Sequence, residues 1–317
     1  MVFRFSCLIF LLLMSIVLSL SFGSVWFSPS ELWSSGILEL RLNRTIAGIF
    51  VGAGLAVSGA LFQGILRNPM ADPYVLGISG GAGLFSAAAM LLGWGLFGAF
   101  CVSLSSFAGA LGTIVLVYAL ARERSGVVHA YTLLLVGIMI NAIAGSLLVF
   151  LFSVAPANRL PGILWQLMGS LQIFNQTLLW TSGLVIMIGL GISLILAPFL
   201  NPLFLGDEKA ATLGLNPNRV RKAVFFTGSM ITGACVSLCG MIGFVGLMVP
   251  HIVRNWLGND NRLLIPGCAL AGAAFLPLAD TVARTVLAPW SGAELPVGAI
   301  TALLGAPFFI VLMGRRR

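Results

Sequence analysis

The chain has 317 residues, of which 59% are hydrophobic and only 8% are charged, and its mean hydropathy is +1.07. Soluble domains carry about 25% charged residues, so this composition excludes an ordinary soluble enzyme as well as a disordered chain. The net charge is +8, but the basic residues are not clustered in the sequence, which argues against nucleic acid as a partner. Apolar runs of about 20 residues match membrane-spanning helices, whereas a membrane β-barrel would alternate over about ten-residue segments. We therefore expect an all-α, polytopic membrane protein.

The first half of the chain predicts five helices. The apolar run 6–27 is either a cleaved signal peptide or a retained first helix, and we favour the retained helix because a clear small-residue cleavage site is missing. A polar stretch covers 28–43. The next helices are expected over 44–66, 77–98, 100–121 and 130–154.

The second half begins with an unusual segment, 155–176, where prolines and Trp165 predict a short helix lying at the membrane interface. Helix six is expected over 177–200 and helix seven over 223–239, on either side of the polar segment 201–222. The run 241–252, interrupted by glycines and Pro250, is expected to form a short, buried helix eight. Helices nine (264–287) and ten (296–314) complete about ten transmembrane helices in a single domain covering 1–317.

The basic residues predict the orientation, because cytoplasmic loops of membrane proteins are enriched in Lys and Arg. With the N-terminus inside, the outer side holds only Arg41, Arg44, Arg159 and Arg284 of the 17 basic residues. The inner side then holds Arg4, Arg67, Arg122, Arg124, Lys209, Arg219, Arg221, Lys222, Arg254, Arg262 and Arg315, Arg316 and Arg317. We expect a multi-pass membrane protein with both termini in the cytoplasm.

The sequence lacks an energy source of its own. The nucleotide-binding pattern GxxxxGK[ST] is absent, so we expect neither ATP hydrolysis nor any other enzymatic activity, and no catalytic residue. The histidines and the five cysteines do not show metal-ligand spacing, so we expect no metal or cofactor on this chain. Asp280 is either a local partner of Arg284, four residues later, or a coupling residue of an ion-driven carrier.

The glycines and one short polar segment indicate how the helices pack and where a partner binds. The 38 glycines are concentrated inside helices, which indicates close helix packing in lipid or, in part, backbone lining a pathway. The segment 206–217 predicts a helix, a stop at Gly214 and a second helix capped by Asn216 with Pro217 following. Because so short a helix is unstable alone, something must pack on it. A cytoplasmic partner is favoured over the membrane surface.

Eight motifs occur in order from about residue 40 to the end: Arg41–Thr45, Gly52–Gly59, Arg67–Pro73, Gly243–Arg254, Pro266–Ala273, Ala279–Arg284, Glu294–Gly298 and Leu304–Phe309. With them the chain resembles the FecCD-type permease family, the transmembrane subunits of type II ABC importers for iron-siderophores, haem and vitamin B12. The resemblance implies the type II ABC importer permease fold, with two inverted halves (helices two to five and seven to ten). It also implies pairing as a homodimer or a close heterodimer.

The resemblance implies further partners. Two cytoplasmic ABC ATPase subunits would bind ATP and Mg, and a periplasmic or lipid-anchored substrate-binding protein would deliver the ligand. The cytoplasmic segment 206–222 matches the coupling helices that contact the ATPase, with Gly206, Asp207, Glu208, Ala211, Leu213, Gly214 and Leu215 as the contact residues.

The resemblance also carries over positions for docking and for the pathway. Arg41, Arg44 and Arg284 match positions that dock the binding protein, although Asn43 stands where a relative has proline. The alternative is that these arginines reach lipid phosphates. His129 and Ala130 fall in the region of the inner gate, and Asn141 and Met168 are candidates to line the pathway.

We therefore expect a permease subunit that translocates an iron-siderophore-type metal chelate, energised by a separate ATPase. Import of vitamin B12 or haem by the same machinery is the alternative. An ion-coupled secondary transporter acting alone is a more distant one, for which Asp280 would be the titrating group. The ligand, the identity of the second permease and the type of cell envelope stay open.

Overall fold

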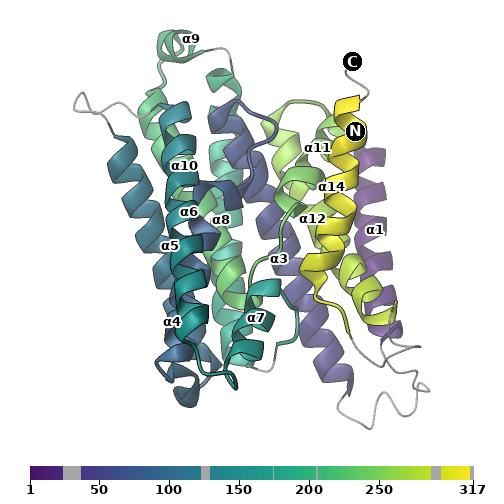
Figure 1. The fold of residues 1–317 in the computed structure, drawn as a ribbon. Helices are drawn as coiled ribbons and strands as arrows, with labels where there is room; N and C mark the ends of the chain where they lie inside the picture. The colour runs from purple at the N-terminus through teal and green to yellow at the C-terminus, as the bar shows by residue number, and fades with distance from the viewer. Residues whose placement is uncertain (24–36, 123–128, 174, 205, 287–293, 315–317) are drawn as a thin grey trace.

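The structure, a computed structural model, describes residues 1–23, 37–122, 129–173, 175–204, 206–286 and 294–314. All regular elements in these ranges are helices, and the long ones run roughly along one common axis (Figure 1). The first residue, the end of α14 and the short helix α9 lie at one end of the bundle, and α7 lies towards the other. We call these the α9 end and the α7 end.

Seven described helices are long and apolar enough to cross a membrane: α1 (Val2–Ser21), α3 (Ile37–Leu66), α5 (Ala99–Ala121), α6 (Ala130–Val154), α8 (Gln176–Leu203), α10 (Pro217–Cys239) and α12 (Asn261–Thr285). The shorter helices are α4 (Ile78–Leu91), α7 (Leu160–Met168), α9 (Asp207–Thr212), α11 (Val245–Leu257) and α14 (Val297–Gly314), with 3₁₀ turns η1 (Pro73–Leu76) and η2 (Trp94–Phe97). Together with α4, α11 and α14, the long helices confirm the predicted polytopic all-α fold of about ten segments.

Several helices begin earlier than predicted, and α3 and α10 differ most. Residues 37–43, expected to be a polar stretch, form the first turns of α3, because Arg41 and Asn43 are buried against the rest of the bundle instead of facing water. Helix α10 begins at Pro217 rather than at 223, since the Asn216 side chain accepts a hydrogen bond from the amide of Arg219. An N-cap of this kind starts a helix wherever it occurs, whatever the polarity of the next residues.

Two other helices differ in length or place. Helix α4 ends at Leu91 instead of 98, because Gly93 adopts a left-handed conformation (φ 81°) and a 3₁₀ turn follows. Helix α11 starts only after Phe244, whose positive φ of 68° breaks the chain there, and it runs to Leu257. Residues 240–244 are therefore not helical, and this leaves their backbone free to contact other segments.

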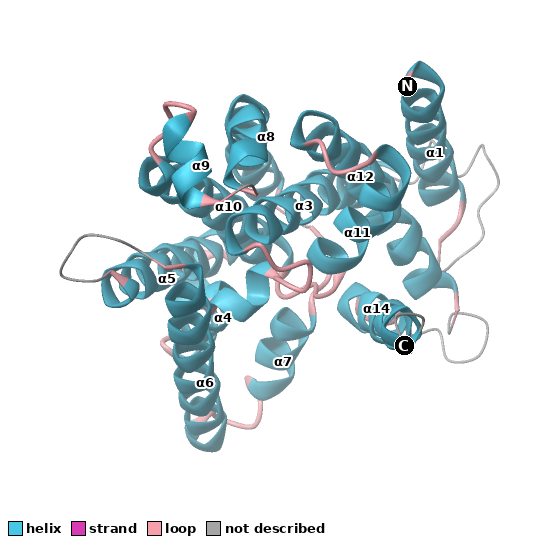
Figure 2. Ribbon diagram, turned by 90° about the horizontal axis from the view of Figure 1, so that it is seen from above, coloured by secondary structure: helices cyan, strands magenta, loops and turns pink. Residues whose placement is uncertain are grey.

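Helix α3 lies at the centre of the bundle, surrounded by α8, α10, α11 and α12 (Figure 2). Its glycines allow backbones to touch. A Cβ atom on Gly52 would overlap the carbonyl of Gly272 in α12, and one on Gly59 would overlap the carbonyl of Gly246 in α11. Small residues permit such contact between helices in lipid, so at these positions the packing interpretation of the glycines is confirmed.

We predict that Gly52→Ala destabilises the protein. The added methyl must push α3 away from the α12 backbone, and overpacking of this kind costs about 1–3 kcal/mol. The thermal unfolding midpoint of the detergent-solubilised protein should fall. Gly112→Ala in α5 is the matched control, because a Cβ there meets nothing within 4 Å. Equal midpoints for the two variants would contradict the prediction.

Candidate functional sites at the two ends of the bundle

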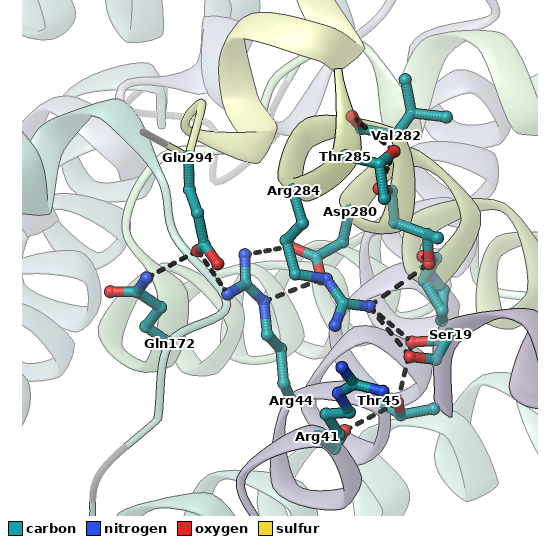
Figure 3. Close-up of polar contacts among 12 residues, drawn as sticks. Ser19, Arg41, Arg44, Thr45, Gln172, Asp280, Val282, Arg284, Thr285 and Glu294 are labelled. Carbon is teal, nitrogen blue, oxygen red and sulfur yellow. Dashed lines mark hydrogen bonds and ion pairs between the residues drawn. The ribbon is translucent and has the colours of Figure 1, made fainter. Parts of the chain in front are cut away.

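Charged side chains from α3, α12 and the segment before α14 form a buried cluster near the α7 end (Figure 3). Arg44 of α3 holds Asp280 of α12 with two parallel hydrogen bonds, Nε to Oδ2 and Nη2 to Oδ1, each 2.8 Å long. Its third nitrogen, Nη1, lies 2.7 Å from Oε2 of Glu294. Gln172 also donates to Glu294, at 2.8 Å. Arg44 of α3 therefore links α12 to the segment that leads into α14.

Two further arginines tie the end of α1 to this cluster. Arg284 places Nε 3.1 Å from Oδ2 of Asp280, and its Nη2 donates to both the carbonyl and the hydroxyl of Ser19. Arg41 donates from Nη1 to the carbonyls of Leu20 and Ser21 at 2.9 and 3.2 Å. Carbonyls at a helix C-terminus carry partial negative charge, so these cations stabilise the end of α1.

The cluster is so well buried that each charge requires an opposite charge beside it. The Asp280 side chain is 1% exposed and that of Arg284 is 3% exposed. Desolvating an ion costs several kcal/mol, and only close partners and hydrogen bonds offset that cost. Arg44 and Arg284 face Asp280 and Glu294, so these four groups carry no net charge. The interpretation of Asp280 as a local partner of Arg284 is confirmed.

The three arginines predicted to dock a binding protein thus lie together, but inside the chain. Arg41 and Arg284 are buried, and the side chain of Arg44 is 11% exposed. Sequence reasoning missed Arg44 as the main partner of Asp280, because no local spacing connects them. It also missed Ser19, Gln172 and Glu294, which carry no sequence signal of pairing. The docking role of the arginines stays a prediction.

At the α9 end, Asp207 joins three elements. It accepts hydrogen bonds from Arg67, just after α3, and from Nη2 of Arg221 in α10 at 3.1 Å to Oδ1 and 3.0 Å to Oδ2. Burial raises the pKa of the Asp207 carboxyl, but the hydrogen bonds and charges of the two arginines lower it more, so the net pKa lies below its usual value. The stabilisation is therefore complete at neutral pH and is lost only as pH falls through that lowered pKa.

The predicted helix–stop–helix is confirmed. Helix α9 ends before Gly214, which is left-handed with φ 80°, and α10 follows its Asn216 cap. Ala210 packs inward, whereas Leu213 is 62% exposed. Of the predicted contact residues, five are exposed and Gly206 and Leu215 are half-buried; the exposed ones are Asp207, Glu208, Ala211, Leu213 and Gly214. The segment thus presents a projecting surface beyond the bundle (Figure 1).

The pathway candidates do not converge on one site. His129 caps α6 and is exposed, and Ala130 is the first residue of that helix. Asn141 lies against Gly80 of α4, while Met168, at the end of α7, is 52% exposed. Part of the predicted gate link, residues 125–128, lies outside the described residues, so these assignments stay predictions.

Two hydrogen bonds connect the segment after α10 to the segment after α3 and to the end of α7. The break after α3 carries Tyr74, whose hydroxyl accepts a hydrogen bond from the amide of Ile242 at 2.8 Å. Next to Ile242, the carbonyl of Cys239 accepts from the amide of Ser170 at 2.8 Å, just beyond α7. The break after α10 therefore lies between the break after α3 and the end of α7, in the middle of the molecule.

Comparison with known proteins places the chain among transporters. The model of the FecCD transport family matches residues 11–315. The chain belongs to the FecCD transport family. It is 40% identical to the Hemin transport system permease protein HmuU of Yersinia pestis, over 95% of this chain and 90% of that one. It is 38% identical to the Vitamin B12 import system permease protein BtuC of Escherichia coli, over 97% and 93%.

The fold of this FecCD family member agrees with a solved structure. A metal-chelate-type ABC transporter in an inward-facing conformation superimposes with a TM-score of 0.88 at 32% identity, covering 98% of each chain. The chain is accordingly a membrane-embedded permease subunit of a type II ABC importer, as the sequence motifs predicted.

We predict that Asp280→Asn destabilises the protein by about 3 kcal/mol, because it leaves two buried arginines without their shared carboxylate. The measurement is the thermal unfolding midpoint in detergent. Glu39→Gln is the control, since Glu39 is exposed and accepts a hydrogen bond from Gln176, and such a surface change stays within about 0.5 kcal/mol. An Asp280→Asn protein as stable as wild type would show that the cluster is not needed for stability.

Proposed function

We propose that this permease carries an iron-siderophore-type metal chelate across the bacterial inner membrane, driven by ATP hydrolysis in a separate subunit. The observation that carries the proposal is family membership over nearly the whole chain. The names of the relatives, which include haemin, vitamin B12 and metal-chelate transporters, support a metal-centred chelate as the ligand class. Haem or vitamin B12 is the second candidate, favoured by the 40% identity to the haemin permease.

The α9 end faces the cytoplasm in this proposal, together with both termini. The excess of basic residues assigned to this side supports it, since cytoplasmic loops are rich in Lys and Arg. The complete importer contains a second permease, identical or closely related, two cytoplasmic ATPase subunits that bind ATP and Mg, and an external substrate-binding protein. This chain supplies the pathway and no catalytic group.

Coupling to the ATPase takes place at α9. Leu213 offers an exposed apolar contact to a groove in the ATPase, with Glu208 and Ala211 beside it on the same exposed segment. Asp207 transmits the movement, because it connects α9 to α10 through Arg221 and to the end of α3 through Arg67. The contacts of Tyr74 with Ile242 and of Ser170 with Cys239 extend this connection to α7.

The charge cluster supports docking of the binding protein indirectly, because it holds the helix ends that form the docking surface. Arg41, Arg44 and Arg284 hold the ends of α1, α3 and α12 in one arrangement at the outer end. For these arginines to pair with acidic residues of a binding protein, contacts within the cluster must be exchanged for contacts with the partner. The ion-driven alternative is disfavoured by the same cluster, because the Asp280 carboxyl is buried and already paired with Arg44 and Arg284.

We predict that reconstituted permease transports its chelate only when the ATPase subunits and ATP are present. The permease has to be driven through α9, so a hydrolysis-deficient ATPase should give no accumulation of a labelled ferric siderophore, haemin or vitamin B12 in proteoliposomes. A proton ionophore should leave ATP-driven uptake unchanged. Uphill uptake by the permease alone would contradict the proposal and would favour an ion-coupled carrier.

We predict that Asp207→Asn uncouples ATP hydrolysis from transport. The variant keeps the shape of the side chain but loses the charge that holds Arg67 and Arg221, so α9 can move without moving α3. The number of chelates carried per ATP should fall several-fold while the ATPase rate persists. Lys209→Gln is the control, because Lys209 is exposed on the same helix and is not among the predicted ATPase contacts. A parallel fall in ATPase rate and transport would instead indicate lost ATPase binding.

A further inference from the structure

A cavity of about 570 Å³ opens near the α7 end, between the end of α4, the start of α5, α7 and the segment that leads into α8. Its volume lies within the range of typical ligand pockets. Arg159 is the one charged side chain among the described residues that line it. The polar lining otherwise consists mainly of carboxamides, Asn158, Gln166, Gln172 and Asn175, and Trp165 lies beside them.

Arg159 differs from the other three arginines at this end. Arg41 and Arg284 are buried and Arg44 is mostly so, and all three are bonded to carboxylates or to the end of α1, whereas Arg159 is exposed. Its Nη1 donates to the carbonyls of Met90 and Leu91 at the end of α4. A guanidinium has five N–H donors, so these two bonds fix its position and leave its charge available. Within the described ranges no carboxylate pairs with it.

From this arrangement we infer that the Arg159 cavity receives an acidic side chain on a loop of the external substrate-binding protein. The inference rests on the proposed function, which requires a binding protein at this end. A positive charge held at the cavity, with no acidic residue among the described lining residues, is complementary to a carboxylate. The carboxamides can bond the backbone of the same loop, and the volume fits several side chains rather than a single ion.

The inference separates two roles at the outer end. Arg159 makes the first contact because its charge is exposed before the partner arrives, and exposed complementary charges act mainly on the association rate. The buried cluster around Asp280 keeps the helix ends in place beneath. Charge reversal at Arg159 should therefore change binding without changing stability, while changes within the cluster change both.

The test measures binding of the cognate binding protein to the permease–ATPase complex in phosphatidylcholine nanodiscs. Arg159→Glu should weaken the affinity about tenfold, a change of about 1.4 kcal/mol, and reduce its dependence on salt. Arg159→Lys should keep most of the affinity. Arg122→Glu, an exposed arginine at the opposite end, is the control. The unfolding midpoint and the basal ATPase rate should match wild type in all three.

A loss of affinity in Arg159→Glu that disappears when an acidic residue of the binding protein is changed to Arg supports the inference, because the pair is then restored with its charges exchanged. Wild-type affinity and salt dependence in Arg159→Glu overturn it, while binding and ATPase stimulation in the wild-type complex would leave the proposed function standing. An effect that requires anionic lipid and not the binding protein also overturns it. Failure of the wild-type complex to bind any binding protein counts against both.

Discussion

The buried carboxylate of Asp280 imposes the strongest constraint on this fold. An ion in a low-dielectric bundle is stable only beside compensating charge, and here Arg44 and Arg284 supply it from two directions. Because Arg44 belongs to α3 and also bonds Glu294, the pairing determines how α3, α12 and the segment before α14 meet. The end of α1 is held in the same place through Ser19. Four separate parts of the chain thus depend on one carboxyl group.

Backbone contact is the second constraint, and it acts in the middle of the bundle. Lipid offers helices no hydrophobic driving force for association, so close packing has to supply the attraction. Gly52 and Gly59 allow α3 to touch α12 and α11 directly. The charge cluster around Asp280 fixes how the helices meet near the α7 end, and the glycines allow close packing in the centre. At the α9 end, Asp207 and its two arginines hold α9, α10 and the end of α3 together.

These features fit the work of a permease that is driven by another subunit. The α9 segment projects beyond the bundle, where a partner subunit can bind it. Ion pairs of Asp207 with Arg67 and Arg221 connect it to the other helices. The 3₁₀ turn η1 after α3 and the non-helical residues after α10 contact each other through Tyr74 and Ile242. Such breaks are tolerated at membrane depth when they are buried in protein, and they are places where a helical bundle can bend.

The sequence by itself determined the class of protein, most helix positions and the short helix at 207–212. These follow from local properties, namely apolar length, the Asn216 cap and the glycine stop, which act within a few residues. The family motifs added the fold of the whole chain. Only the tertiary structure decided which charges are buried, because Arg44 and Asp280 are 236 residues apart and no periodic pattern links them. For the same reason the sequence did not distinguish exposed Arg159 from the three buried arginines: exposure depends on what packs against a side chain.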